Sequence, residues 1–519
     1  MQTVHVTNRT DEGRSIQEPH MPSPRRRDFI NQLPTEILIN VFRNSLDPAR
    51  PGRDLSRLRG VCNLWKSIVE STPSLWNYIS ADDGIQYIRD AITKTGEVSL
   101  DLVYRWYGDT TMTVEDFLTA VMDKSKYWRS VDIAFWRTPS TYPGLQSMPC
   151  RTLEALELWH ALESSNLPEA FSLFGGMSAP PTLKKLTLGR VPVRLESLEL
   201  VELEALTLVS LGPQSMLEII RILKTSPRLV TLVLEDIVGL QPPQTGAAPA
   251  IQLQHLETLK LQLPVSTTEF LLSTLYTEKV DRLTVDPECS SFLPSMLFTP
   301  SVTHWVPVLR RMVQKAGRIE IGFEDSDLCF LKLGKLDYLF QMEFVDRTQF
   351  GRDILDWHLA NLGEAVAHLP ARLSYHNVCP HFGDIRLFSQ LPEVTELSIS
   401  HIWRSEQVPS KLFKALGSPT RSKPPEWLLP NLLILHYDLN NGCHKSLLAM
   451  LKRRYGSRGN AEPSLDELAP PPSLREIRFY GGTGKTWAPT KDEALLREVQ
   501  LLSKGAQIYW VDELHVLDD

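Results

Sequence analysis

The 519-residue chain lacks several features that would assign it to a class of protein at once. Its six cysteines are widely spread and show no paired spacing, so we expect no disulfide framework and a reducing compartment. No window reaches the ~18 uninterrupted apolar residues that a membrane helix needs. Residues 1–27 contain no apolar stretch of the kind found in a secretory signal, so we do not expect secretion.

An excess of charge of one sign is also missing. The chain has 55 basic and 62 acidic residues and a net charge of −7, which is no electrostatic footprint for nucleic acid or for an anionic membrane. With 42% hydrophobic residues the composition is that of a globular protein, and we expect its partners to be proteins. The chain is too long for one ordinary compact core, so we expect either several domains or an elongated repeat array. The expected location is cytoplasmic, nuclear or both.

The N-terminal segment, residues 1–28, is polar and is predicted to be a disordered tail. It contains three consecutive arginines, Arg25 to Arg27, that would suit either a nuclear-import patch or a merely solubilising segment.

A compact helical unit is predicted over residues 29–80. Its first helix begins around Pro34 in the sequence LPTEILINVF, residues 33–42, which places four apolar side chains at helical spacing: Ile37, Leu38, Val41 and Phe42. The loop LDPARPGR, residues 46–53, contains prolines and a glycine that prevent the helix from continuing.

A second helical run is predicted after this loop, with Asp54 as its N-cap and Thr72-Pro73 at its end. Seven residues would lie along one stripe at about 3.6 residues per turn: Leu55, Leu58, Val61, Cys62, Trp65, Ile68 and Val69. A unit of ~50 residues buries too little surface to be stable alone, so part of the stripe is expected to dock on a partner. The alternative is that every one of these residues is internal core and caps the first repeat.

The rest of the chain, residues 81–519, repeats a short apolar pattern. The form L-x-x-L-x-L starts at Leu153, Leu183, Leu203, Leu229, Leu256 and, with valines, Val280. These starts are 30, 20, 26, 27 and 24 positions apart, close to the roughly 20–29 residues of leucine-rich repeats. Four other segments fit the same frame: Val131/Ile133, Val394/Leu397/Ile399, Leu432/Leu435/Tyr437 and Leu474/Ile477/Phe479. Each of these units is predicted to supply a short strand.

Helical patterns separate the strands, for example at 216–223 and at 308–316. Strands and helices that alternate at this period favour a solenoid, because one unit cannot cover its own apolar faces. A doubly wound α/β domain is the alternative, and the recurring leucine pattern favours the solenoid. The array is irregular: Leu195/Leu198/Leu200 starts only eight residues before Leu203, and segments 324–392 and 405–428 break the period.

The helical unit resembles the F-box, whose pattern LPxEILxxVF, VCxxW and PxLW is matched in order and spacing over residues 30–80. The loop from Leu46 to Arg53 is longer than in that pattern. The resemblance implies an α+β fold with a trihelical F-box followed by an irregular leucine-rich-repeat α/β solenoid, an arrangement similar to that of fungal-type F-box-like families. It also implies that the chain binds a Skp-family adaptor, and through it a cullin, in an SCF-type cullin-RING ubiquitin ligase.

The resemblance assigns adaptor contact to six residues of the first helix and to four that would serve partly in docking and partly in the core. They are Leu33, Pro34, Ile37, Leu38, Val41, Phe42, and then Leu58, Val61, Cys62 and Trp65. For Trp65 a purely internal position is an equal alternative, since large aromatic side chains are usually core.

Signals for chemistry are weak. The sequence FYGGTGKT, 479–486, fails as a phosphate-binding loop because Phe479 stands where the first glycine is required. His376, Cys379, His381 and Cys443-His444 lack the spacing of a zinc site, and FEDSD, 323–327, lacks that of a calcium loop. No nucleophile with a base and an orienting group is evident. We therefore expect no catalysis, no cofactor and no metal.

These observations predict a substrate receptor of a ubiquitin ligase, in which the repeat array binds an unknown protein substrate. One alternative is a ligase-independent F-box and leucine-rich-repeat scaffold or ligand sensor. A second is a nucleotide hydrolase that uses Gly481 to Thr486.

Overall fold

A computed structural model describes most of the chain between residues 32 and 511. The described ranges are 32–47, 50–105, 112–135, 150–160, 172–176, 178–196, 198–243, 250–285, 304–316, 319–324, 328–333, 340–345, 371–375, 394–399, 407–419, 426–438, 444–455, 471–480, 493–503 and 505–511. The predicted tail, residues 1–28, lies outside them. No helix in these ranges is long and apolar enough to cross a membrane.

Helices occur throughout the described chain. The α-helices are α1 (Thr35–Ser45), α2 (Pro51–Arg59), α3 (Asn63–Ser71), α4 (Ile85–Lys94), α5 (Val114–Val121), α7 (Met216–Thr225), α8 (Val265–Thr274), α9 (Val306–Ala316), α12 (Gln407–Leu416), α13 (His444–Tyr455) and α14 (Glu493–Leu502). Short 3-10 helices are η2 (Pro73–Leu75), η3 (Ala81–Asp83), η4 (Met122–Tyr127) and η5 (Leu173–Gly176).

Seventeen strands form one sheet. They are β1 (Tyr78–Ser80), β2 (Leu100–Arg105), β3 (Trp128–Phe135), β4 (Ala155–His160), β5 (Lys185–Gly189), β6 (Ala205–Val209), β7 (Thr231–Glu235), β9 (Thr258–Gln262), β11 (Arg282–Val285), β12 (Ile319–Glu324), β13 (Leu328–Leu333), β14 (Phe340–Val345), β15 (Ala371–Tyr375), β16 (Val394–Ile399), β17 (Ile434–Asp438), β18 (Glu476–Tyr480) and β19 (Gln507–Val511). Two more strands, β8 (Ile251–Gln252) and β10 (Leu275–Tyr276), form a separate parallel pair.

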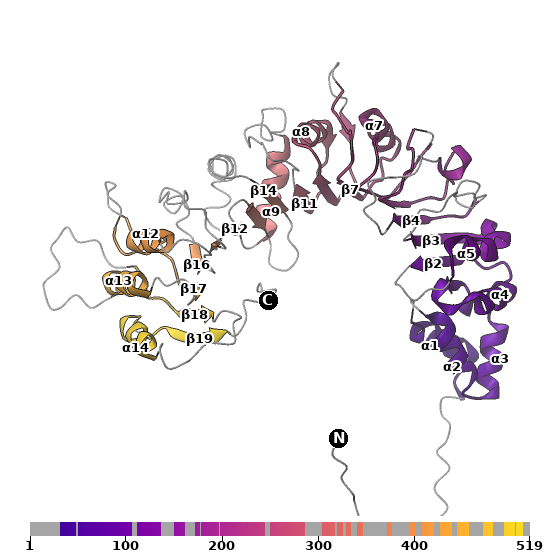
Figure 1. Cartoon of the computed structure of the whole chain (residues 1–519), viewed down its shortest axis with the longest axis horizontal. Coiled ribbons are helices and arrows are strands. Elements are labelled where there is room, and N and C mark those ends of the chain that lie inside the picture. Colours follow the sequence, from indigo (N-terminus) through magenta and orange to yellow (C-terminus); the bar gives the residue numbers. More distant parts are fainter. Residues whose placement is uncertain are drawn as a thin grey trace, which may run out of the picture.

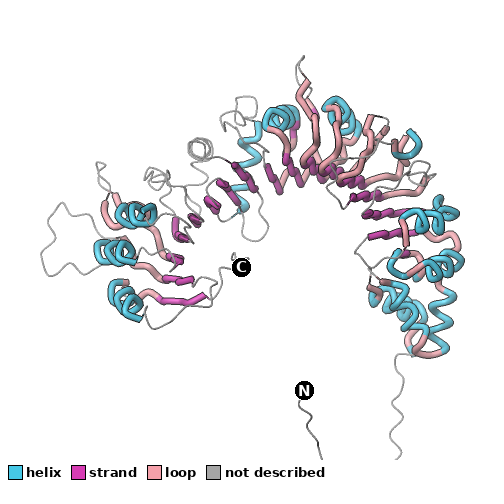
Figure 2. Tube along the Cα trace, viewed as in Figure 1, coloured by secondary structure: helices cyan, strands magenta, loops and turns pink. Residues whose placement is uncertain are grey.

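The strands follow one another through the sheet almost in chain order. The run from β1 to β11 is parallel throughout, and so is the run from β15 to β19. Between them β14, β13 and β12 come in reverse order, with β13 antiparallel to both of its neighbours. The sheet bends into an open arc whose inner side is lined by strands and whose outer side carries the helices (Figures 1 and 2).

Leucines hold consecutive strands together. Along one row of the sheet the paired residues are Leu102, Val131, Leu156, Leu186, Leu206, Leu232, Leu259 and Leu283. All of them are buried, and burying a side chain of this size stabilises a fold by roughly 1.5–3 kcal/mol. Their neighbours in β4, β6, β7 and β9 are half-buried on the other face, which is the alternation expected of strands covered on one side.

The structure has a strand at each place where the leucine pattern predicts one, from β3 to β11 and from β16 to β18. It also explains the irregularities. The segment around Leu195 and Leu198 is a buried turn rather than an extra strand. Within 324–392, where the period breaks, β13 and β14 form a meander with the preceding β12, and a meander needs no intervening helix.

Candidate functional site

Helix α1 carries two apolar stripes rather than one. Leu38 and Phe42 are buried, while Leu33, Ile37 and Val41 are 41%, 47% and 49% exposed. Leu38 and Phe42 are four residues apart and lie along one side of the helix, and Ile37 and Val41 lie along the adjacent side, with Leu33 two residues before the helix begins. The inner stripe packs into the protein, and the outer stripe leaves apolar surface in solvent.

The start of α1 is set by Pro34, whose carbonyl accepts hydrogen bonds from the N–H groups of Ile37 and Leu38 at 3.0 and 3.1 Å. Proline lacks an N–H to satisfy there, so it suits the entry to a helix. Glu36 in the first turn and Arg43 in the last turn complement the helix dipole.

The predicted continuous run from Leu55 to Val69 is wrong, because the chain breaks into α2 and α3. Cys62 is extended, with φ −162° and ψ 168°, and precedes α3. The prediction of Asp54 as N-cap is also wrong: α2 begins three residues earlier, with Pro51 in its first turn. The predicted loop, residues 46–53, is therefore helical from Pro51 onward.

The break between α2 and α3 exposes two more apolar side chains. Val61 is 58% exposed and Leu64 is 42% exposed. The sequence pattern does not predict Leu64 as a contact, because Leu64 lies off the apolar stripe of a continuous helix. Trp65 packs its ring against Phe42, with ring centroids 4.7 Å apart and an interplanar angle of 54°, so α3 is held against α1.

The ten residues predicted to contact an adaptor fall into three groups. Exposed are Leu33, Pro34, Ile37, Val41 and Val61; partly buried are Leu58, Cys62 and Trp65; buried are Leu38 and Phe42. For Leu38 and Phe42 the structure corrects the prediction, because side chains that are 1% and 0% exposed are core and offer a partner no surface.

We call Leu33, Ile37, Val41, Val61 and Leu64 the exposed apolar set. Eleven large hydrophobic side chains are exposed in the described part of the chain, and these five lie within 32 consecutive residues, numbers 33–64. Single exposed apolar residues are ordinary, but a concentration of this kind marks an interaction surface.

Trp76 anchors the three helices to the start of the sheet. Its ring is fully buried, its Nε1–H donates to the carbonyl of Val69 at 2.7 Å, and it stacks on Tyr87 of α4 with centroids 5.7 Å apart. The ammonium of Lys94 lies 4.2 Å from the ring centroid. Because β1 follows at Tyr78 and pairs with β2, the helical unit and the sheet share one core.

A second contact at this junction joins α2 to η3. The N–H of Gly52 donates to Asp83 Oδ2 at 3.0 Å. A Cβ on Gly52 would lie 2.6 Å from Asp83 and 2.8 Å from the Tyr87 ring, so the close approach requires glycine. Burial raises the pKa of Asp83 to about 6, although the backbone N–H groups of Gly52 and Arg53 act in the opposite direction.

We expect Asp83→Asn to change how stability depends on pH. The folded protein holds the Asp83 proton more tightly than the unfolded chain, whose ordinary pKa is near 3.8. Stability from this group is therefore greatest below about pH 4 and is lost as pH rises through about 6. The asparagine does not titrate and still accepts from Gly52. Relative to the variant, the wild type should lose stability between pH 4 and 6, measured by thermal unfolding.

The matched control is Asp123→Asn, which removes an exposed carboxylate in η4. Its pH profile should follow the wild type. Parallel profiles for the wild type and Asp83→Asn would contradict the assignment.

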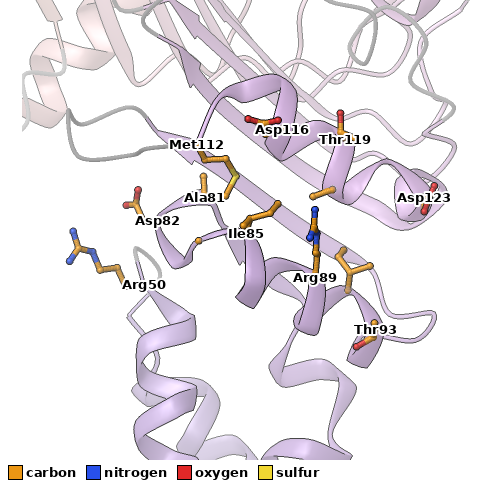
Figure 3. Close-up of a pocket in the computed structure, with 13 residues that line it drawn as sticks. Arg50, Ala81, Asp82, Ile85, Arg89, Thr93, Met112, Asp116, Thr119 and Asp123 are labelled. Atoms are coloured by element: carbon orange, nitrogen blue, oxygen red, sulfur yellow. The ribbon is translucent and has the colours of Figure 1, made fainter.

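A cleft of about 1010 Å³ lies beside the junction, between η3 and α4 on one side and α5 and η4 on the other (Figure 3). Ile85, Ile92 and Met112 supply apolar surface, and Arg89 and Asp116 supply charge. Two threonines, Thr93 and Thr119, also line it.

Other predicted chemical signals are largely untested by the structure. His376, Cys379, His381, Cys443 and most of FYGGTGKT and FEDSD lie outside the described residues. Among the residues that are described, no group of three or more histidine, cysteine, aspartate or glutamate side chains could hold a metal ion.

A family model described as F-box-like matches residues 30–82, which span α1, α2, α3, η2 and β1. No curated protein matches the chain. Domains of this kind typically bind Skp-family adaptors and suggest an adaptor-dependent role in ubiquitin ligase complexes. The matched segment contains all five members of the exposed apolar set and Gly52, and Asp83, the hydrogen-bond partner of Gly52, is the next residue after it.

Proposed function

We propose that this chain, an F-box protein, is the substrate-recognition subunit of an SCF-type cullin-RING ubiquitin ligase. Its F-box would bind a Skp-family adaptor and through it a cullin, while the rest of the chain would bind a target protein. The role requires a cytoplasmic or nuclear location.

The exposed apolar set is the observation that supports this proposal most directly. Ile37 and Val41 lie along one side of α1, Leu33 lies just before that helix, and Val61 and Leu64 lie around the start of α3. Covering apolar surface is worth roughly 25 cal/mol per Å², and an adaptor groove that receives these side chains would gain that energy. Leu33, Pro34, Ile37, Val41, Val61 and Leu64 are the adaptor contacts that we propose, with Leu58, Cys62 and Trp65 behind them.

We propose further that residues 81–519 form an irregular leucine-rich-repeat solenoid. The row of paired leucines from Leu156 to Leu283, the parallel strands and the helices on one side of the arc support this view. A solenoid presents its inner face as an extended binding surface. We place target recognition there.

No covalent chemistry is proposed for this chain. Its contribution would be proximity, since a target held near the ubiquitin-loaded partner reacts as if the step were intramolecular. The shared core around Trp76 supports this role, because it fixes the sheet relative to the F-box instead of leaving the two on a flexible linker.

Reconstitution tests the proposal. The full chain, a recombinant Skp-family adaptor and a cullin are mixed and separated by size-exclusion chromatography. We expect a ternary complex with the chain at one copy. Adaptor without cullin would favour a ligase-independent scaffold, and binding of neither would overturn the F-box assignment of function.

A further inference from the structure

Trp159 lies flat on the inner face of the sheet. The strands line the inner side of the arc and the helices lie on its outer side (Figure 1). Strand β4 alternates between half-buried and buried residues, so the buried Leu156 and Leu158 face the helices and the half-buried Trp159 faces the open side. A Cβ built on Gly189 of the next strand would meet the indole at 2.0 Å. The six-membered ring therefore rests directly on the glycine backbone.

Small neighbours on both sides make room for this ring. Trp159 pairs with Ala134 in β3 and with Gly189 in β5. One face of the indole packs on the backbone of Gly189, and the opposite face points toward the open side of the sheet. A partly exposed tryptophan held in this way is a rigid platform for another group.

Glu157 lies beside the platform, two residues earlier on the same face. The indole Nε1–H donates to Glu157 Oε1 at 2.7 Å, so the carboxylate is held at the edge of the ring. This bond uses one oxygen of the carboxylate and leaves acceptor capacity on the other.

Glu157 differs from the other acidic side chains on the inner face between β2 and β9. Asp101 pairs with Arg129, Asp132 with Arg105, and Glu235 with Lys260. Each of those carboxylates has a cation from a neighbouring strand. Glu157 has none among the described residues, and its hydrogen bond comes from a neutral indole.

Arg105 in β2 and Lys185 in β5 are basic side chains of nearby strands, and neither forms an ion pair with Glu157 in the described structure. Arg105 is bound to Asp132. Lys185 lies two residues before Thr187, the β5 partner of Glu157. Burial first and then Glu157 raise the pKa of Asp132, which places the two carboxylates within electrostatic range of each other.

We propose that Trp159 and Glu157 form a subsite for an arginine side chain of the target protein. The inference rests on the proposed function, since it gives the chemistry of the segment that the inner face would recognise. The guanidinium stacks on the free face of the indole and donates to the open oxygen of Glu157.

The geometry favours arginine over other groups. A guanidinium is planar, so it stacks on an indole face and still directs N–H donors to a carboxylate at the ring edge. A lysine ammonium would place a point charge over the ring, and it lacks the coplanar N–H donors with which a guanidinium can stack and bind the carboxylate at once. An anionic side chain would meet both Glu157 and the electron-rich ring face, so it is excluded on charge.

The test uses the full chain labelled with 5-fluorotryptophan, whose twelve tryptophans give the fluorine resonances to be followed. Trp159→Phe identifies the Trp159 signal. The probes are N-acetyl-arginine amide and its neutral analogue N-acetyl-citrulline amide. We expect only the Trp159 signal to shift with arginine, in the millimolar range, and Glu157→Gln to weaken binding about tenfold.

The controls separate the subsite from general effects. Lys260→Gln removes a cation of the same face and should leave the titration unchanged, whereas Lys185→Gln removes a nearby repulsion and should tighten it. Gly189→Val pushes the ring away and should abolish the response. An equal shift with citrulline, or none with arginine while the fold is intact by circular dichroism, would overturn the proposal.

A selection experiment extends the test to peptides. A random nonapeptide phage library panned on the wild type should enrich arginine, and the same library panned on Glu157→Gln should not. If arginine is not enriched while adaptor binding is normal, the arginine subsite is contradicted and the proposed F-box function is not. If adaptor binding is lost while the arginine titration is normal, the F-box function is contradicted and the subsite is not.

Discussion

Replacing Ile37 and Val41 together by aspartate is expected to abolish adaptor binding without unfolding the protein. Both side chains are about half exposed, so the isolated chain tolerates a charge there. In a complex the two carboxylates would be buried without partners, at several kcal/mol each. We expect at least a hundredfold loss of affinity in calorimetry with a Skp-family adaptor, and a melting temperature within about 2 °C of wild type.

Leu217→Asp is the matched control. Leu217 lies on α7, far along the chain from the F-box, and is 63% exposed. An aspartate there should leave adaptor affinity unchanged. Unaltered binding by the Ile37 and Val41 double variant would show that the outer stripe of α1 is not the docking surface. Substituting Leu38 or Phe42 instead would be uninformative, because loss of the core would itself remove binding.

Trp76→Ala is expected to have the largest effect on stability, about 3–5 kcal/mol, as for other large-to-small aromatic substitutions in a core. The change removes a fully buried ring, its stack on Tyr87 and its hydrogen bond to the Val69 carbonyl. It should loosen the F-box from the sheet. Hydrogen exchange should increase first in α3 and α4, while the row of leucines stays protected.

Trp76→Phe separates the ring from its N–H group. Phenylalanine keeps most of the apolar contact but leaves the Val69 carbonyl without its donor, so a loss of about 1–3 kcal/mol is expected. If Trp76→Ala unfolds in one transition with uniform exchange over the whole chain, the junction is not a separable cooperative unit. If it costs under 1 kcal/mol, the ring is not the anchor described above.

Much of the sheet could be predicted because its pattern is local. Leu206 and Leu208 alternate with Thr207 within three residues, and such a period of two requires a strand with one covered face. The same pattern could not predict β13. This strand is antiparallel to both β12 and β14, so its pairing depends on two reversals of the chain direction that the leucine pattern does not record. β1 and β2 were also missed, because they lack the full leucine pattern.

The interaction surface was only partly predictable. A helical stripe shows which residues are apolar, and it does not show which of two adjacent apolar rows meets the core. Leu38 and Ile37 differ by one position and by a rotation of 100°, and tertiary packing buried the first and left the second 47% exposed. The same holds for Leu64, whose exposure depends on the break at Cys62.

By itself, then, the amino-acid sequence determined the strand period, the leucine rows and the presence of an F-box, because each of these is written in spacings of a few residues. Tertiary structure alone decided which apolar side chains remain uncovered, that Gly52 meets Asp83 and that Trp159 rests on Gly189. Those contacts join residues about 30 positions apart. Their distances depend on how whole strands and helices pack, which no local spacing records.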